Sequence, residues 1–283
     1  MYHNIGRLGN LMREWASGIG LAHRNGLEMC AVVVDFPELP TVFKGPFPDC
    51  EDREKTGIVL HEDQGDRVRT FRFRDGEEVS DISLTGYQLN CKNFFDARRQ
   101  VAETFTLLDG PREAALKFLE PYQNKIKIGI HVRRGDKTGP NWVGRLPTMH
   151  YFADAIARAR QDFPDAELAF FISSDSIDWC KEQEAFQSED IHFVEASNEE
   201  DTPVPSYIFD FAVLMQMDHF VISDGTYGWW AAWLGAWQRG GAVYHSGRMD
   251  YDNWCDNNDI PGFSRVVGDS KTLYYSDSWK ASD

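Results

Sequence analysis

Residues 126–136 have the sequence IKIGIHVRRGD, in which an apolar run stops abruptly at two arginines, a glycine and an aspartate. The apolar run is rich in β-branched residues, which predicts a buried strand over residues 126–132. Strands buried on both faces are typical of parallel sheets, where ligands collect beyond the carboxyl ends of the strands. The charged end of this strand is therefore the first place to expect a binding site.

The chain after residue 125 repeats this alternation of apolar runs and polar ends. Further strand-like runs cover residues 168–172, 191–194, 219–223 and 242–244. Helical patterns lie between the runs, at residues 149–163, 177–185, 207–217 and 227–237. Such a βαβαβ series predicts a parallel sheet with helices on both faces.

The first 124 residues follow a less regular pattern. We expect a helix over residues 10–25, ended by Gly26, and a strand over residues 29–34. Residues 36–76 are charged and contain several prolines, and two more helical patterns follow at residues 93–105 and 111–119. We therefore predict an α/β protein with two domains, residues 1–124 and residues 125–283.

Polar residues follow the ends of four predicted strands. They are His131, Arg133, Arg134 and Asp136; Ser173, Ser174 and Asp175; Glu195; and Ser223, Asp224, Gly225 and Thr226. The carboxyl ends of parallel strands meet at one edge of the sheet, so we expect these residues to line one binding cleft.

Arg133 and Arg134 are the strongest candidates for anion binding. The planar guanidinium matches phosphate oxygens and stays charged at any working pH, so an arginine can neutralise a diphosphate without a metal. Adjacent side chains on a strand point in different directions, so at most one faces a ligand directly while the other braces the loop. The alternative is a structural arginine–aspartate pair, and the position at a strand end favours ligand binding.

The overall charge excludes some classes of partner. The chain has 45 acidic and 29 basic residues, a formal net charge of −16, which argues against nucleic acid or an anionic membrane. No apolar run of about 18 residues is present, and we expect no membrane contact from this chain. The absence of a signal peptide and of glycosylation sequons favours a cytoplasmic protein, if the chain is complete.

Neither the cysteines nor the acidic motifs predict a metal site. The five cysteines are widely spaced and form no CxxC pair, so we expect free buried thiols. Residues 250–252, Asp-Tyr-Asp, have the spacing with which some glycosyltransferases hold Mn²⁺, but they lie in a polar stretch with no strand before them. We interpret them as a solvated turn and predict no metal.

Three weaker motifs each have a structural alternative. Residues 6–10, GRLGN, form either an anion-binding glycine loop or a tight turn before a helix. Residues 173–175, SSD, suit helix capping as well as ligand binding. Residues 223–233, SDGTYGWWAAW, combine a helix start with tryptophans that are more typical of a core than of a ligand shelf. The tripeptide RGD at residues 134–136 suggests an adhesion ligand, which its fusion to an apolar strand argues against.

Taken together and in this order, the motifs resemble the α-1,2-fucosyltransferases of glycosyltransferase family 11, especially the animal galactoside 2-fucosyltransferases. The likeness extends over roughly residues 5–244. The segments that carry it are GRLGNLMREWASGIGLAHRNG, LTGYQLNCKNFFDARRQVAETFTL, REAALKFL, IGIHVRRGDK, ISSDSIDWCKE and FAVLMQMDHFVISDGTYGWWAAWLG. HxRRGD with GxLGN upstream and a Ser-x-Gly-Thr-x-Gly-x-Trp-like segment downstream is a specific combination, although each part alone is not.

The resemblance implies a GT-B-like α/β fold, two Rossmann-like halves facing a cleft, and an inverting, metal-independent transfer. L-fucose would pass from GDP-β-L-fucose to the 2-hydroxyl of a terminal β-galactoside, with no cofactor. Residues 125–283 would bind GDP-fucose, and residues 1–124 would form the acceptor side. The relatives are Golgi membrane proteins with an N-terminal anchor, so the alternative location is the Golgi lumen, for a chain that lacks its anchor.

The resemblance also assigns roles to residues. Arg133 would contact the pyrophosphate, and Arg134 would orient the loop or share that contact. The other donor-binding residues would be Gly9, Asn10, His131, Ser173, Ser174, Asp175, Ser223, Asp224, Gly225 and Thr226. Asp136 and Glu14 are the candidates for the general base, and bracing an arginine is an equal alternative for Asp136. The chain departs from the animal galactoside enzymes at Lys137, where they usually have an aromatic residue.

Two rival functions remain open at this stage. One is a transferase that uses another GDP-sugar or makes another fucosyl linkage. The other is a non-catalytic module that binds a nucleotide sugar without turnover. Binding of GDP-fucose and GDP-mannose, followed by an assay of GDP release, separates the two rivals from the first hypothesis.

Overall fold

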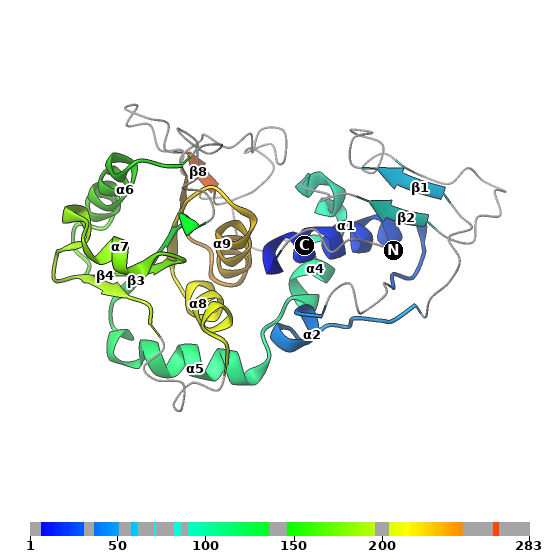
Figure 1. Cartoon of the computed structure of the whole chain (residues 1–283), viewed down its shortest axis with the longest axis horizontal. Coiled ribbons are helices and arrows are strands. Elements are labelled where there is room, and N and C mark those ends of the chain that lie inside the picture. The colour runs from blue at the N-terminus through cyan, green and yellow to red at the C-terminus, as the bar shows by residue number, and fades with distance from the viewer. Residues whose placement is uncertain are drawn as a thin grey trace. The chain divides into compact units, whose positions relative to one another are not determined.

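The computed structural model describes residues 7–30, 37–50, 58–61, 71, 82–85, 90–135, 146–195, 204–245 and 263–265. The chain divides into two compact units (Figure 1). The first contains the described residues up to Leu108, and the second contains those from Asp109 to Arg265. The division therefore lies between Leu108 and Asp109, earlier than the boundary near residue 124 that we expected.

The first unit is built around α1 (Leu8–Asn25). Its buried apolar residues recur every three or four positions, as a helix packed on one side requires. Gly26 ends α1 in the left-handed conformation, at φ 64°, and its N–H faces the carbonyls of Ala22 and His23. Gly20 permits the close approach of a neighbouring segment, because a Cβ there would overlap the backbone of Asn93 and Phe94.

Short elements complete the first unit. The helices are α2 (Leu39–Val42), η3 (Cys91–Asn93), η4 (Phe95–Ala97) and α4 (Arg98–Thr104). The strands β1 (Ile58–His61) and β2 (Ile82–Thr85) form a parallel pair. The single helix expected over residues 93–105 is therefore two 3-10 turns and a short α-helix. Residues 29 and 30 are not in a strand, and residues 31–34 of the expected strand lie outside the described residues.

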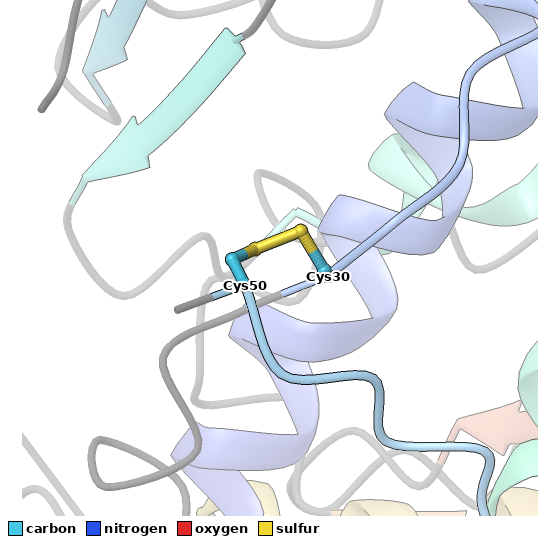
Figure 2. The surroundings of a disulfide bond; sticks show 2 residues. All are labelled: Cys30 and Cys50. Carbon is cyan, nitrogen blue, oxygen red and sulfur yellow. A yellow bond between two sulfur atoms is a disulfide. The ribbon is translucent and has the colours of Figure 1, made fainter. Parts of the chain in front are cut away.

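A disulfide joins Cys30, which follows α1, to Cys50 (Figure 2). Their Cα atoms lie 5.3 Å apart. Cys91 is also disulfide-bonded, whereas Cys180 is free and buried. The expectation of free thiols is thus wrong for three of the cysteines and correct for Cys180. The 20-residue separation of Cys30 and Cys50 gives no local signal, because the fold of the intervening chain determines their approach.

The second unit contains a six-stranded sheet in the order β5-β4-β3-β6-β7-β8, and every pairing is parallel. Its strands are β3 (Ile126–Val132), β4 (Leu168–Ser174), β5 (Ile191–Phe193), β6 (His219–Ile222), β7 (Val243–His245) and β8 (Phe263–Arg265). The predicted parallel sheet is confirmed. β3 is central, which explains why its residues from Ile128 to Val132 are all buried.

Helices cover both faces of this sheet (Figure 1). They are α5 (Asp109–Leu119), α6 (Met149–Asp162), α7 (Ile177–Lys181), α8 (Ser206–Met215) and α9 (Thr226–Arg239), with 3-10 turns η5 (Glu120–Tyr122) and η8 (Glu184–Phe186). Ile128 and Ile130 of β3 pack in the core with Phe152 of α6. Gly129 faces the other way, where a Cβ would lie 3.0 Å from Leu214 of α8. The alternation follows from the two-residue period of a strand.

Packing explains why α5 belongs to the second unit. The ring of Phe118 lies 5.6 Å from Phe209 of α8 and 6.1 Å from Phe171 of β4. Such edge-on aromatic contacts contribute stability beyond the burial of their area. α5 is therefore fixed to the sheet unit, although it precedes the first strand of that sheet.

The disulfide yields a chemical prediction. Protein unfolded without reductant should react with a thiol reagent at Cys180 but not at Cys30 or Cys50, and peptide mapping should recover the Cys30–Cys50 crosslink. The double variant Cys30→Ser/Cys50→Ser should lose about 3 kcal/mol of unfolding free energy, because the unfolded chain is no longer restricted by a 20-residue loop. Labelling of Cys30 before reduction would contradict the pairing; Cys180 is the internal control.

Candidate active site at the carboxyl edge of the sheet

Three neighbouring strands bring the predicted residues of the second unit together. His131 of β3 is in register with Ser173 of β4 and Ile222 of β6. The N–H of Ser223 donates to the carbonyl of His131 at 3.0 Å, which continues the pairing beyond the end of β6. The polar residues that follow these strands therefore lie at one edge of the sheet, as the sequence predicts.

Ser223 fixes the start of the loop after β3. Its Oγ accepts a hydrogen bond from the backbone N–H of Arg133 at 2.7 Å. The same oxygen lies 3.3 Å from Nδ1 of His131. Ser223 is itself buried, so these contacts are sheltered from water. The hydroxyl thus connects the ends of β3 and β6 and sets the direction in which the arginines leave the sheet.

His131 is a buried, uncharged side chain. Burial, and secondly the charge of Arg133, lower the pKa of His131 to about 3. The imidazole is therefore neutral at physiological pH. Its ring packs against Tyr227, and a Cβ at Gly228 would overlap the ring. Only glycine at that position of α9 allows the helix to cover His131 so closely.

Asp175 holds both arginines of the HVRRGD motif. Its Oδ2 forms an ion pair with the Arg133 guanidinium, and its Oδ1 accepts a hydrogen bond from the backbone N–H of Arg134 at 2.8 Å. Gly135, at φ 22°, leaves room for this carboxylate, because a Cβ there would overlap it. The side chains of Arg133 and Asp175 are 18% and 27% exposed, so the pair is accessible to solvent.

The arginine–carboxylate pair anticipated from the sequence therefore exists, but its acid is Asp175. Asp136, the other candidate partner and a candidate base, lies outside the described residues. Arg134 takes a different position from Arg133: its guanidinium carbon lies 3.6 Å from the centre of the Trp179 ring. The two arginines thus have different surroundings, as two adjacent side chains at a strand end should.

Asp210 is a site-edge residue that our sequence analysis missed. It lies in α8, and its Oδ2 accepts a hydrogen bond from Ser173 Oγ at 2.9 Å. Burial is the main cause that raises the pKa of Asp210 to about 7; the Ser173 hydrogen bond opposes the shift and Glu195 adds to it. The available signal was a lone acid in the otherwise apolar helix SYIFDFAVLM.

Two predicted residues serve the backbone of the turns. Ser174 Oγ accepts a hydrogen bond from the N–H of Ser176 at 3.0 Å, so SSD stabilises the turn before α7. Gly225 caps α9 with a φ of 146°, and Asp224 and Thr226 flank it, all three partly exposed. The first N–H groups of α9 therefore begin at the same edge as the arginines, an arrangement that favours anions.

The aromatic residues of α9 belong to the core. Trp229 and Trp230 are fully buried, and Trp233 is 5% exposed. Trp230 and Trp233 pack edge-on, with centroids 5.5 Å apart. The interpretation of these tryptophans as core residues is confirmed.

Gly9, Asn10 and Glu14 belong to the first unit. α1 begins at Leu8, so Gly9 and Asn10 form its first turn instead of a glycine loop before the helix. The reason is that the N–H groups of Asn10 and Leu11 donate to the Arg7 carbonyl, at 2.8 and 3.2 Å. Asn10 and Glu14 are four residues apart and thus share one side of α1.

The described residues provide neither a metal cluster nor a helix that could span a membrane. No group of three or more His, Cys, Asp or Glu residues among them is placed to hold a metal ion. Residues 250–252, the Asp-Tyr-Asp motif, lie outside them. No helix in the described part of the chain has the length and apolar character needed to cross a membrane.

Comparison with known families agrees with this architecture. The model of glycosyl transferase family 11 matches residues 3–245. The chain belongs to this family. The resemblance inferred from the motifs is thereby confirmed.

Curated relatives carry galactoside fucosyltransferase names. Galactoside α-(1,2)-fucosyltransferase 2 of Oryctolagus cuniculus is 30% identical over 247 residues, which cover 81% of this chain and 65% of the relative. The enzyme of the same name from Hylobates lar is 32% identical over 242 residues, covering 81% and 67%. Galactoside 2-α-L-fucosyltransferase Sec1 of Mus musculus is 30% identical over 246 residues, covering 81% and 62%. The chain thus spans about two thirds of the length of these relatives.

Solved structures share the fold. The fucosyltransferase NodZ from Bradyrhizobium has a TM-score of 0.56 at 16% identity and covers 80% of this chain and 89% of its own. NodZ α-1,6-fucosyltransferase soaked with GDP-fucose has a TM-score of 0.54 at 17% identity, covering 80% and 88%. Together with the observed parallel sheet, these likenesses confirm the expected α/β, GT-B-like fold class.

The partly buried Asp210 gives a testable pH dependence. Between about pH 4 and about pH 7, the folded protein keeps the proton of Asp210, whereas the unfolded chain has lost it. The contribution of Asp210 to the unfolding free energy therefore falls as the pH rises through this range. Asp210→Asn keeps the shape without the charge. The unfolding free energy of the variant relative to the natural chain should therefore rise with pH in that range, by at most about 1.4 kcal/mol per pH unit.

Urea unfolding at several pH values measures this difference. Asp178→Asn is the control, because it removes an acid whose side chain is 96% exposed. Parallel pH profiles for the natural chain and Asp210→Asn would show that the fold does not raise the pKa of Asp210.

Proposed function

We propose that this chain transfers L-fucose from GDP-β-L-fucose to the 2-hydroxyl of a terminal β-galactoside, with inversion at the anomeric carbon and without a metal. The observation that carries the proposal is the pair of arginines at the carboxyl end of β3, held by Asp175, in a member of family 11. The names of the curated relatives support the acceptor and the linkage. The NodZ crystals soaked with GDP-fucose support the donor.

In the proposed reaction, the acceptor oxygen attacks C1 of fucose from the side opposite the diphosphate. The C1–oxygen bond to the β-phosphate breaks, the new glycosidic bond forms, and GDP leaves with the bonding electron pair. Negative charge grows on the β-phosphate during this step. Arg133, with the N-terminal amides of α9, would stabilise that charge, and one preorganised donor of this kind contributes about 3–4 kcal/mol in other enzymes.

The acceptor hydroxyl must also lose its proton. A carboxylate within reach would take it as the sugar oxygen attacks. Asp136, directly after Gly135, and Glu14 in α1 are our two candidates for this base. His131 is a poor candidate, because burial keeps its pKa at about 3 and leaves the ring a weak proton acceptor.

We further propose that the chain works in an oxidising compartment. Disulfides such as Cys30–Cys50 persist in secretory compartments and are rare in the cytosol. This favours the Golgi lumen over the cytoplasm. Recovery of the endogenous chain with Cys30 and Cys50 reduced would contradict the proposal.

Removal of Arg133 is the direct test of the pyrophosphate site. Arg133→Ala should abolish binding of GDP-fucose, measured by titration calorimetry, and GDP release in the presence of lactose, while the fold is retained. Arg160→Ala is the matched control, because it also removes an arginine from an ion pair in the same unit. Arg160 lies in α6, and its partner Asp190 directly precedes β5, so this pair is at the start of a strand and not at its carboxyl end. Undiminished turnover of Arg133→Ala would refute the assignment.

The identity of the reaction needs separate measurements. The glycosidic linkage of the product, determined by NMR, should be α-1,2, and GDP-mannose should bind more weakly than GDP-fucose. Binding of GDP-fucose without GDP release, across a range of galactosides, would instead indicate a non-catalytic module.

Metal independence is tested with EDTA. Arginines carry the charge in the proposed mechanism, so activity should be unchanged after chelation and dialysis. A loss of activity that Mn²⁺ restores would contradict this and implicate residues 250–252.

A further inference from the structure

Trp179 forms an unusual support for one of the two arginines. It lies in α7, directly after the turn that contains Asp175. Its side chain is partly buried and packs against the core that contains Ile172 and Phe152. The Arg134 guanidinium carbon lies 3.6 Å from the centre of the ring. At this distance the cation lies in contact with the aromatic face, the geometry in which cation–π attraction is strongest.

The surroundings of the two arginines show why this stack matters. Arg133 has a carboxylate partner, Asp175, for its guanidinium. Asp175 contacts Arg134 through the backbone N–H alone. Within the described part of the chain, the Arg134 guanidinium has the Trp179 ring as its partner and no carboxylate. Stacking engages the face of the guanidinium and leaves its in-plane N–H groups available for an anion.

We propose that Trp179 is a positioning residue, which holds the guanidinium of Arg134 at the carboxyl edge of the sheet so that it binds a phosphate oxygen of a nucleoside diphosphate sugar. This inference rests on the proposed function and adds a second phosphate-binding arginine to it. Trp179 itself does not contact the donor. The ring already restricts the Arg134 side chain in the unbound protein. The entropic cost of ordering this side chain when a ligand binds is therefore smaller.

The position of Arg134 supports this role. Its N–H is bound to the same carboxylate as the Arg133 guanidinium, so the two residues are fixed together by Asp175. Gly135 leaves room for the Asp175 carboxylate beside both residues, because a Cβ there would overlap it. A diphosphate has several oxygens that accept hydrogen bonds, and one arginine can donate to only some of them. Two adjacent guanidinium groups can donate to more of these oxygens.

A graded series of substitutions at Trp179 tests the inference. Trp179→Phe keeps a weaker aromatic face, and Trp179→Leu keeps apolar bulk without one. The KM for GDP-fucose should rise by about threefold in the Phe variant and about tenfold in the Leu variant, because the Leu variant loses the cation–π contact that the Phe variant partly keeps. The KM for the galactoside and kcat should stay near their natural values, and the Kd of GDP should follow the donor KM.

Trp237→Leu is the matched control. Trp237 is another partly buried tryptophan of the same unit, and its ring stacks on Trp233 near the C-terminal end of α9. A merely structural effect would lower the thermal midpoint of both Leu variants and leave the donor KM of both unchanged. Equal donor KM values for Trp179→Leu and Trp237→Leu would overturn the proposal.

A double-mutant cycle with Arg134→Lys identifies the path of the effect. Lysine keeps the charge but lacks the planar group that stacks on the ring. In the Arg134→Lys background, Trp179→Leu should raise the donor KM by less than about twofold. Fully additive effects would show that Trp179 does not act through Arg134. If Trp179→Leu does not fold, the Phe variant and Arg134→Lys carry the test, and an unchanged donor KM in both overturns the inference.

The same experiments separate this inference from the proposed function. A natural chain that binds no GDP and releases none from GDP-fucose refutes both. A natural chain that turns over GDP-fucose, with a Trp179→Leu variant that retains the natural donor KM, refutes only the positioning role.

Discussion

The carboxylate of Asp175 is the contact on which the arrangement of the site depends. Two arginines that are adjacent in sequence repel each other. The carboxylate of Asp175 offsets this repulsion, because it pairs with the guanidinium of Arg133 and accepts a hydrogen bond from the N–H of Arg134. This contact exists because β3 and β4 are parallel neighbours whose ends are level, with Val132 opposite Ser174. A shift of one residue would turn the side chains of one strand to the other face of the sheet. The register of the sheet and the placement of the two arginines are thus one constraint.

On the side of β3 that faces β6 and α9, the neutral state of His131 determines how many positive charges the site holds. His131 adjoins Arg133, and protonation of its ring would add a third positive charge. Burial beneath α9, which Gly228 permits, keeps the pKa of His131 at about 3, so the ring stays neutral. Ser223 bonds to both residues and aligns the loop without adding charge. The positive charge therefore comes from the two arginines, whereas the pKa of Asp210 in α8 is raised to about 7.

The sequence predicted the parts of this structure that local pattern determines. The strand over residues 126–132 and the polar ends of its neighbours follow from apolar runs of fixed length, and the convergence of those ends follows from the parallel sheet. The Cys30–Cys50 pair and the hydrogen bond between Ser173 and Asp210 did not follow, because each joins residues that are distant in sequence. The Trp179 stack was missed for a related reason: its partner lies on a different element, after another strand.

The acidic composition sharpens the role of the local arginines. At physiological ionic strength a charge is screened over about 8 Å, so the net charge of −16 does little to a ligand already in contact with the site. It does act on anions that approach, and it lowers non-specific retention of phosphates on the rest of the surface. In the proposed reaction GDP leaves with more negative charge than the donor carried. In that proposed reaction, the adjacent guanidinium groups would stabilise the charge where it develops, and the net negative charge of the chain would repel GDP once it has left the site.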